Sequence, residues 1–248
     1  MRIIPFDSLE STNKYCEALD LAQVEDFTCY WALAQTAGIG QRGNHWAAAA
    51  GENLTFSLVL HPSFLPADRQ FKLTETLSLA ILDSLNTVVC RRLGRQRLTL
   101  TTNIKWPNDI YVGDRKICGT LVSSRLSGNS ITSAICGIGL NVNQTAFPDW
   151  VPNPTSLSLL TGQSYALESL LQQLLACIEI RYDNLRSGVD PEPEYLEHLL
   201  NLGVPARYKY KEEEIEATVT GVDPHGRLLL TSSDGRRLCC GMKEIALL

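Results

Sequence analysis

The sequence predicts an α+β fold, in which a mixed, largely antiparallel sheet is backed by helices and followed by a small C-terminal β-barrel. Two long segments, 70–93 and 165–185, carry apolar residues at helical spacing. Short apolar runs separated by turn residues lie between them and indicate several strands. From Gly203 onward the chain consists of short strand-like runs, which is typical of a closed or half-closed barrel. We therefore predict two domains, 1–202 and 203–248.

The N-terminal part is expected to form one short helix and two strands around a glycine-rich loop. Ser11 can cap a helix over 12–22. The apolar side of this helix would carry Tyr15, Ala18, Leu19 and Ala22. The runs 27–34 and 54–60 are predicted strands, and the loop 35–46 follows the first of them.

The remaining elements follow from apolar periodicity and turn chemistry. The helix over 70–93 should stop at Gly94, and the helix over 165–185 at Gly188. A short helix over 191–200 would have Asp190 as its N-cap and Pro191 in its first position. Strands are predicted at 98–106, 109–112, 117–125 and 130–140, and then at 206–210, 216–222, 227–231 and 236–240.

Composition indicates a soluble protein and excludes several classes. The 248 residues are 44% hydrophobic and 20% charged, as in globular proteins, and the net charge of −5 argues against binding nucleic acid. The start of the chain lacks a signal-peptide pattern, and no apolar run is long enough to span a membrane. A cytoplasmic protein is therefore expected. The eight cysteines show no C-x-x-C pairing and should be small buried hydrophobes, and the four histidines have no metal-ligand spacing.

The loop 35–46, which reads QTAGIGQRGNHW, is the first candidate site. Its three glycines let the backbone approach a ligand closely, and successive exposed N–H groups can form an anion-binding concavity. A mobile glycine-rich hairpin loop without function would have the same composition. The loop alone does not decide between these readings.

Other polar or glycine-bearing stretches accompany this loop. They are Ser11-Thr12-Asn13, the string KWPND at 105–109, KICG at 116–119 and GIGLNVN at 137–143. Together and in this order they resemble the biotin protein ligases, and the resemblance covers essentially the whole chain. It implies a fold like that of class II aminoacyl-tRNA synthetases with an SH3-like C-terminal barrel. Only ten residues precede Ser11, so the ligase-only type without an N-terminal DNA-binding domain is expected, with no DNA partner.

The resemblance implies a two-step reaction. Biotin and ATP form biotinyl-5′-AMP, and biotin then passes to a lysine of a biotin carboxyl carrier protein or domain. Two anions must meet in the first step, so the site must supply positive charge and N–H donors. The implied biotin-binding residues are Ser11, Thr12, Asn13, Gln35, Gly38, Ile39, Gly40, Gln41, Lys116 and Gly119. The implied ATP- or adenylate-binding residues are Arg42, Trp46, Lys105, Asn108 and Asn141.

Lys116, Asp109 and Arg42 are the expected catalytic residues. Lys116 would bridge the biotin carboxylate and the α-phosphate, whereas a lysine before a strand is ordinarily solvated. Asp109 would orient Lys116 or accept a proton from the acceptor lysine, but Pro107-Asn108-Asp109 is also ordinary turn chemistry. Asn141 could equally be a turn residue, Trp46 a loop anchor and Trp106 part of the core.

The loop also departs from the usual pattern of the family, which is close to GRGRRGR-x-W. Ile39, Gln41 and Asn44 stand where basic residues are common, which leaves Arg42 as the cation of the loop. Either Arg42 and Lys116 supply the necessary positive charge by themselves, or biotin and the adenylate bind less tightly. We also expect the loop to be disordered or open until ligand arrives.

Several alternatives remain open. The chain could be a ligase for lipoate or another carboxylic acid, or a non-catalytic sensor of biotin or nucleotide. Mg²⁺ is implied as a cofactor, but no metal ligands can be assigned, because this ion keeps several waters and is held partly by phosphates. Family enzymes can pair along sheet edges, so a homodimer is possible.

Overall fold

A computed structural model describes residues 1–93, 101–242 and 244–248. Its larger unit is a seven-stranded sheet with the order β1-β2-β3-β7-β6-β5-β4. The strands are β1 Arg2–Leu9, β2 Thr28–Gln35, β3 Asn53–Leu60, β4 Thr102–Lys105, β5 Asp109–Val112, β6 Arg115–Ser127 and β7 Ser130–Asn141. The β1–β2 pair is parallel and the other pairs are antiparallel, which confirms the predicted mixed, largely antiparallel sheet.

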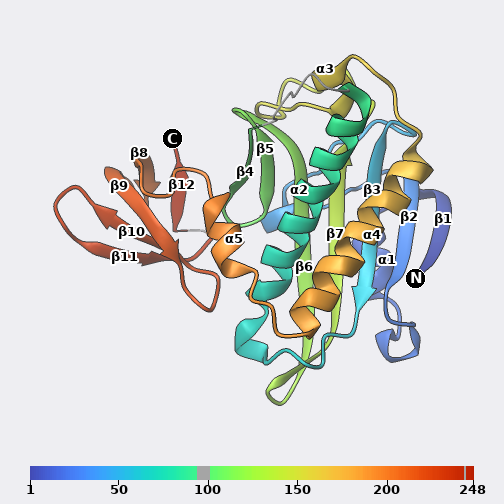
Figure 1. The fold of residues 1–248 in the computed structure, drawn as a ribbon, viewed down its shortest axis with the longest axis horizontal. Coiled ribbons are helices and arrows are strands. Elements are labelled where there is room, and N and C mark those ends of the chain that lie inside the picture. Colours follow the sequence, from blue (N-terminus) through green and yellow to red (C-terminus); the bar gives the residue numbers. More distant parts are fainter. Residues whose placement is uncertain (94–100, 243) are drawn as a thin grey trace.

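Helices cover one face of this sheet. Helix α2 Phe71–Leu93 and helix α4 Leu167–Arg186 lie side by side on this face and pack against each other (Figure 1). Both helices were predicted from their apolar periodicity, to within two residues at each described end. The expected stop at Gly94 lies outside the described residues.

Strand β3 is buried on both faces because a second layer covers the other side. Its alternate residues Leu58 and Leu60 belong to the large core under α2 and α4. The intervening Val59 belongs to a small cluster with Cys16 and Leu21, as the two-residue period of a strand requires. Helix α1 Thr12–Glu17 therefore lies on the face opposite to α2 and α4.

Helix α1 is shorter than predicted. The Ser11 cap is confirmed, since its hydroxyl accepts a hydrogen bond from the Lys14 amide at 3.5 Å. The expected continuation to residue 22 is wrong because the Asp20 carboxylate starts a separate 3₁₀ turn, η1 Leu21–Gln23, by accepting from the Ala22 amide at 3.2 Å. The buried side of α1 carries Thr12, Asn13 and Cys16, whereas Ala18 and Ala22 are exposed.

Three short or exposed elements were not predicted. They are the edge strand β1, helix α3 Leu157–Thr161 and strand β12 Ile245–Leu247. Helix α5 spans Glu192–Glu197, inside the predicted 191–200. Strand β4 is likewise shorter than the predicted 98–106, of which 98–100 lie outside the described residues. Two 3₁₀ turns, η2 Gln41–Gly43 and η3 Ala67–Arg69, complete the first part of the chain.

The C-terminal strands form a separate five-stranded antiparallel sheet with the order β11-β10-β9-β8-β12. They are β8 Pro205–Tyr210, β9 Glu213–Val222, β10 Leu228–Ser232, β11 Arg237–Cys240 and β12. This C-terminal sheet lies beside β4, β5 and α5 (Figure 1). Its inward residues, including Tyr208, Val219 and Leu228, join the large core. A division into domains at Gly203 stays a prediction.

Two expectations drawn from composition concern the cysteines and the absence of membrane-spanning helices. The described cysteines are free thiols, and all but Cys177 and Cys239 are buried, which fits small core residues rather than disulfides. The side chain of Cys90 lies outside the described part. None of the described helices combines the length and apolarity needed to cross a bilayer.

Candidate active site

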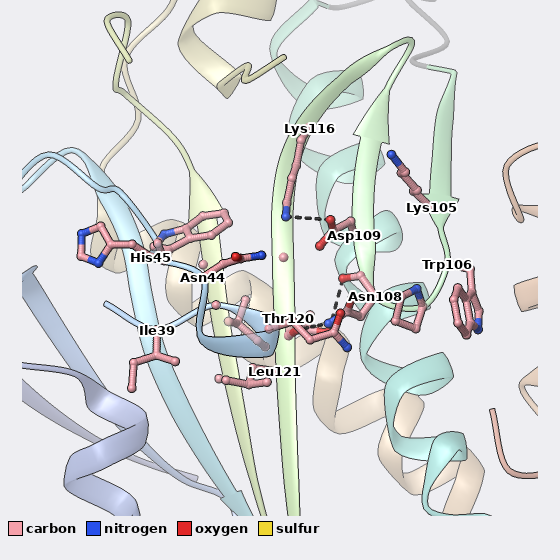
Figure 2. A pocket seen from close by; sticks show the side chains of 18 of the residues that line it. Ile39, Asn44, His45, Lys105, Trp106, Asn108, Asp109, Lys116, Thr120 and Leu121 are labelled. Carbon is pink, nitrogen blue, oxygen red and sulfur yellow. Dashed lines mark hydrogen bonds and ion pairs between the residues drawn. The ribbon is translucent and has the colours of Figure 1, made fainter. Parts of the chain in front are cut away.

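One cavity of about 290 Å³ collects most of the residues that the sequence singled out (Figure 2). The predicted residues on its wall are Ser11, Thr12, Asn13, Gln35, Ile39, Gly40, Gln41, Trp46, Lys105, Asn108, Asp109, Lys116 and Gly119. Gly38 and Asn141 are not on that wall. The side chain of Arg42 lies outside the described part of the chain. Segments separated by more than a hundred residues thus converge because β2, β5, β6 and β7 share one sheet.

A bulge in β6 aims Lys116 at Asp109. Ile110 pairs with Cys118 but the next residue, Tyr111, pairs with Lys116, so Ile117 is an extra residue in the ladder. A bulge of this kind moves the following side chain to the other face of the strand. Lys116 consequently shares a face with Tyr111 and Asp109, and its Nζ lies 2.7 Å from Asp109 Oδ2 (Figure 2). Both side chains are about a quarter exposed, at 25% and 28%.

Glycines on two neighbouring strands make room for this pair. A Cβ on Gly119 would lie 3.2 Å from Asp109 Oδ1, 3.2 Å from the Trp46 ring and 3.3 Å from Lys116 Cε. Its cross-strand partner Gly139 lies directly under Trp46, and a Cβ there would be 2.3 Å from the indole. The two glycines therefore form a flat floor on which Trp46 rests, with Lys116 Nζ 5.5 Å from the ring centroid.

The opposite end of the cavity is a polar subsite built on α1, β2 and β3. Gln35 Oε1 accepts from the Thr12 amide at 2.7 Å and from the Thr12 hydroxyl at 3.2 Å. The Ser57 hydroxyl lies 2.7 Å from Thr12 Oγ1 and also contacts Asn13 Oδ1. Asn13 Nδ2 is buried without a hydrogen-bond partner in the described residues, so an unused donor lies in the wall of the cavity.

Sequence reasoning missed some residues that shape this subsite. Ser57 anchors two predicted binding residues, yet it lies in the buried strand β3 and is fully enclosed. Gly137 lies under Asn13, and a Cβ on it would be 2.3 Å from Asn13 Oδ1. A polar or glycine residue inside an otherwise apolar strand is the signal that could have revealed them.

The glycine-rich loop forms a compact hairpin over the cavity. Ile39 and His45 pair as an antiparallel bridge. The Gly40 amide donates to Asn44 at 2.7 Å, and the Trp46 amide donates to Gly38 at 2.9 Å. These two N–H groups are therefore committed within the loop rather than free for an anion. Whether the loop is disordered or open without ligand stays a prediction.

Asn141 is the last residue of β7 and is buried. It is 4% exposed, and its amide Nδ2 donates to the Thr155 carbonyl at 3.0 Å. Its Oδ1 has no hydrogen-bond partner in the described residues. Asn108 is likewise buried, where its amide donates to the Thr120 carbonyl. Contact of either residue with a nucleotide stays a prediction.

The charge of the cavity suits an anionic ligand pair. Among its described lining residues, Lys105 and Lys116 are the lysines and Asp109 is the carboxylate. One carboxylate that is already paired with a lysine is a poor protein cage for Mg²⁺. The described residues contain no group of three or more His, Cys, Asp or Glu side chains that could hold a metal.

Comparisons with known proteins give the family of the chain. The model of the Biotin/lipoate A/B protein ligase family matches residues 5–141. The bifunctional ligase/repressor BirA of Bacillus subtilis (strain 168) is 30% identical over 238 residues, which cover 94% of this chain and 70% of that protein. The biotin–[acetyl-CoA-carboxylase] ligase of Paracoccus denitrificans is 31% identical over 238 residues, which cover 92% and 94%.

Solved structures show the same fold. The biotin protein ligase from Aquifex aeolicus in complex with biotin and ATP superposes with a TM-score of 0.79 at 24% identity, covering 100% of this chain and 98% of that one. The biotin acetyl coenzyme A carboxylase synthetase from Helicobacter pylori with bound biotinylated ATP gives a TM-score of 0.60 at 25% identity, covering 96% and 99%.

Proposed function

Because the chain belongs to the biotin/lipoate A/B protein ligase family, we propose that its cavity is the active site of a biotin protein ligase. The enzyme activates biotin with ATP to biotinyl-5′-AMP and transfers biotin to a lysine of a biotin carboxyl carrier domain. The observation that carries this function is the Lys116–Asp109 pair on the Gly119–Gly139 floor, next to a polar subsite.

The polar subsite is suited to the ureido ring of biotin. Such a ring presents one carbonyl acceptor and two N–H donors. Asn13 Nδ2 is an unused buried donor, and the Ser11 and Thr12 hydroxyls and Gln35 can serve as donors or acceptors. Phe56 and Ile138 add apolar wall. A few convergent polar groups in an apolar pocket are typical of small-molecule sites.

Lys116 is the residue to which we assign charge stabilisation in both steps. In the first step, a biotin carboxylate oxygen bonds to the α-phosphorus and the bond to pyrophosphate breaks. In the second, the amine of the acceptor lysine bonds to the acyl carbon, the bond to AMP breaks and a proton leaves the amine. The ammonium of Lys116 can neutralise the developing oxyanions. Asp109 orients Lys116 through their 2.7 Å ion pair or accepts that proton, and both roles stay open.

The cofactor, the remaining binding residues and the pairing of two copies complete the proposal. Mg²⁺ would enter with ATP, held mainly by phosphate oxygens and water, as this ion prefers. Arg42, Lys105, Trp46, Asn108 and Asn141 are proposed to bind the nucleotide. Gly38, Ile39, Gly40, Gln41 and Gly119 are proposed to border biotin. Pairing of two copies through a sheet edge also stays a proposal.

Biotin-dependent ATP–pyrophosphate exchange tests this function. The purified chain is incubated with ATP, Mg²⁺ and labelled pyrophosphate, with biotin, lipoate or no acid. Label should enter ATP with biotin only. Exchange that lipoate supports and biotin does not would assign the chain to the other acid named by its family, and exchange without any acid would contradict the proposed reaction.

A further inference from the structure

The turn that precedes Asp109 is held from three directions. Residues 106–108 join β4 to β5, and Asp109 is the first residue of β5. Toward the sheet, the Thr120 amide donates to the Asn108 carbonyl at 3.2 Å. The other two supports come from outside the sheet, from α5 and from the C-terminal sheet.

Helix α5 supports the turn through Tyr195. The Tyr195 hydroxyl donates to the Pro107 carbonyl at 3.0 Å, and the side chain is fully buried. Burial raises the pKa of Tyr195 well above its ordinary value, so the hydroxyl stays protonated. Directly after α5 the chain also joins β4, since the Ile104 amide donates to His198 at 2.8 Å and the Leu200 amide donates to Ile104 at 2.9 Å.

The C-terminal sheet supports the turn through Gly226. Trp106 is turned away from Lys116 (Figure 2), and its indole Nε1 donates to the Gly226 carbonyl at 3.0 Å. Gly226 has a φ of 82° and lies so close to Phe71 that a Cβ would be 2.3 Å from the ring. The Phe71 ring in turn meets Tyr195 edge-on at 5.7 Å. The two supports are therefore packed against one another through Phe71.

We propose that Tyr195 is a positioning residue for the Lys116–Asp109 pair, and that it acts together with the Trp106–Gly226 contact by fixing the turn before Asp109. This inference rests on the proposed function. Neither Tyr195 nor Gly226 lines the cavity, so neither touches a ligand there. Displacement of the turn moves Asp109 first, and through the ion pair it moves Lys116. The polar subsite on α1, β2 and β3 belongs to other strands and is left in place.

Tyr195→Phe tests the proposal because it keeps the ring on Phe71 and removes only the hydroxyl. The Pro107 carbonyl then loses a hydrogen bond, which is worth about 1 kcal/mol or a factor of about five. We expect kcat of biotin-dependent exchange to fall by about that factor. The Kd of biotin from calorimetry should change by less than about two-fold, since its ring is held elsewhere. Trp106→Phe removes the hydrogen bond to Gly226 and should also lower kcat, although Trp106 itself borders the cavity. It serves as a second variant if Tyr195→Phe does not fold.

Tyr182→Phe is the matched control. Tyr182 is 1% exposed, and its ring packs against Phe27 and Phe64 rather than against the turn. Like Tyr195→Phe, this variant removes one buried hydroxyl, but the Tyr182 hydroxyl has no hydrogen-bond partner in the described residues. It should therefore keep its thermal stability and its kcat. The proposal is overturned if Tyr195→Phe keeps wild-type kcat, or if kcat and biotin affinity fall together in both tyrosine variants. Failure of the proposed function would show differently, as an absence of exchange in the wild type.

Discussion

Lys116 meets Asp109 because one extra residue in β6 turns its side chain toward the cavity. A regular strand would direct Lys116 and Cys118 to one face, and the bulge at Ile117 places them on opposite faces. Gly119 leaves the space between Lys116, Asp109 and Trp46 open, since a Cβ there would lie 3.2–3.3 Å from atoms of all three. At the scale of single residues, the site therefore depends as much on a missing side chain and a ladder irregularity as on the charged groups.

Lys116→Ala should largely abolish formation of the adenylate while the fold survives. Loss of a preorganised donor of this kind costs about 10²–10³ in rate, or ~3–4 kcal/mol. Asp109 would be left unpaired, but it is 28% exposed and can be solvated. Pyrophosphate release and circular dichroism measure the two outcomes. Lys209→Ala, an exposed lysine on β8, should retain activity. Release near the wild-type rate in the Lys116 variant would remove Lys116 from the mechanism.

Glu75 gives the stability of the protein a pH dependence that can be isolated. Its side chain is 2% exposed, with Lys72 Nζ at 3.1 Å. The same ammonium also forms ion pairs with Asp190 and Glu192, each at 2.8 Å. Burial, only partly offset by Lys72, raises the pKa of Glu75 from 4.5 to about 7. The folded state therefore binds this proton more tightly than the unfolded state does, and stability is lost as pH rises through that interval.

Glu75→Gln should remove this loss. Relative to wild type, the free energy of unfolding of the variant should improve by on the order of 2–3 kcal/mol between about pH 5 and pH 8. Urea unfolding at both pH values measures the difference. Glu212→Gln, at an exposed site, should leave the pH dependence unchanged. If the two variants respond alike to pH, Glu75 does not titrate as described.

At the scale of elements, the loop 35–46 brings uncharged side chains to the cavity. Ile39, Gln41 and Asn44 line it, at positions where the resemblance leads us to expect basic residues. The Gln41 side-chain Nε2 lies 2.7 Å from Met242 Sδ, in the C-terminal part of the chain. The described cations of the cavity are two lysines on β4 and β6 rather than side chains of the loop.

Ile39→Arg should slow the dissociation of biotinyl-5′-AMP. An arginine here adds a bidentate donor that can pair with a carboxylate or phosphate oxygen. Release of labelled adenylate after dilution gives the rate. Leu33→Arg adds the same charge on β2, at a 37% exposed side chain outside the cavity wall, and should have no effect. An unchanged rate in Ile39→Arg would show that the loss of basic residues does not weaken retention.

Gly139→Ala tests the glycine floor. The new methyl group would be 2.3 Å from the Trp46 indole, so the ring must move. Overpacking of this kind costs about 1–3 kcal/mol, and we expect binding of biotinyl-5′-AMP to weaken by about ten-fold. Calorimetry measures the affinity and tryptophan fluorescence the displacement. At Gly241 the nearest atom to a new Cβ would be 3.6 Å away, so Gly241→Ala should bind normally. Equal affinity in both variants would contradict the floor.

The elements that the sequence predicted well are those with strong periodicity. Helices α2 and α4 and strands β3, β5 and β7 were found because buried faces impose a regular apolar pattern. Strand β1 was not predicted because it is an exposed edge strand with an irregular burial pattern. Helix α3 and strand β12, with five and three residues, are too short to show a repeated apolar pattern.

The candidate site was predictable in membership but not in arrangement. Motif strings marked many of the residues that line the cavity, but not those from the C-terminal sheet such as Tyr208 and Ile245. The Lys116–Asp109 contact depends on the register of β5 with β6. Support from Ser57, Tyr195 and Gly226 could not be read from motifs, because these residues act through buried or backbone contacts. Tertiary packing determines such contacts, and local sequence does not encode them.

At the scale of the whole molecule, two sheets meet at the turn that precedes Asp109. The large sheet provides the cavity, and residues of both sheets line it, including Tyr208 and Ile245 from the C-terminal sheet. The Trp106–Gly226 hydrogen bond joins the sheets next to Asp109. The C-terminal sheet thus contributes to the wall of the cavity and contacts the turn before Asp109.

The most direct test of the central claim is transfer of biotin to a carrier. The purified chain is mixed with ATP, Mg²⁺, biotin and a biotin carboxyl carrier domain, and intact-mass spectrometry follows the carrier. The account predicts one biotinyl group on one lysine of the carrier, dependent on both ATP and biotin and absent with Lys116→Ala. A carrier that stays unmodified, or one that Lys116→Ala modifies as fast as wild type, would contradict it.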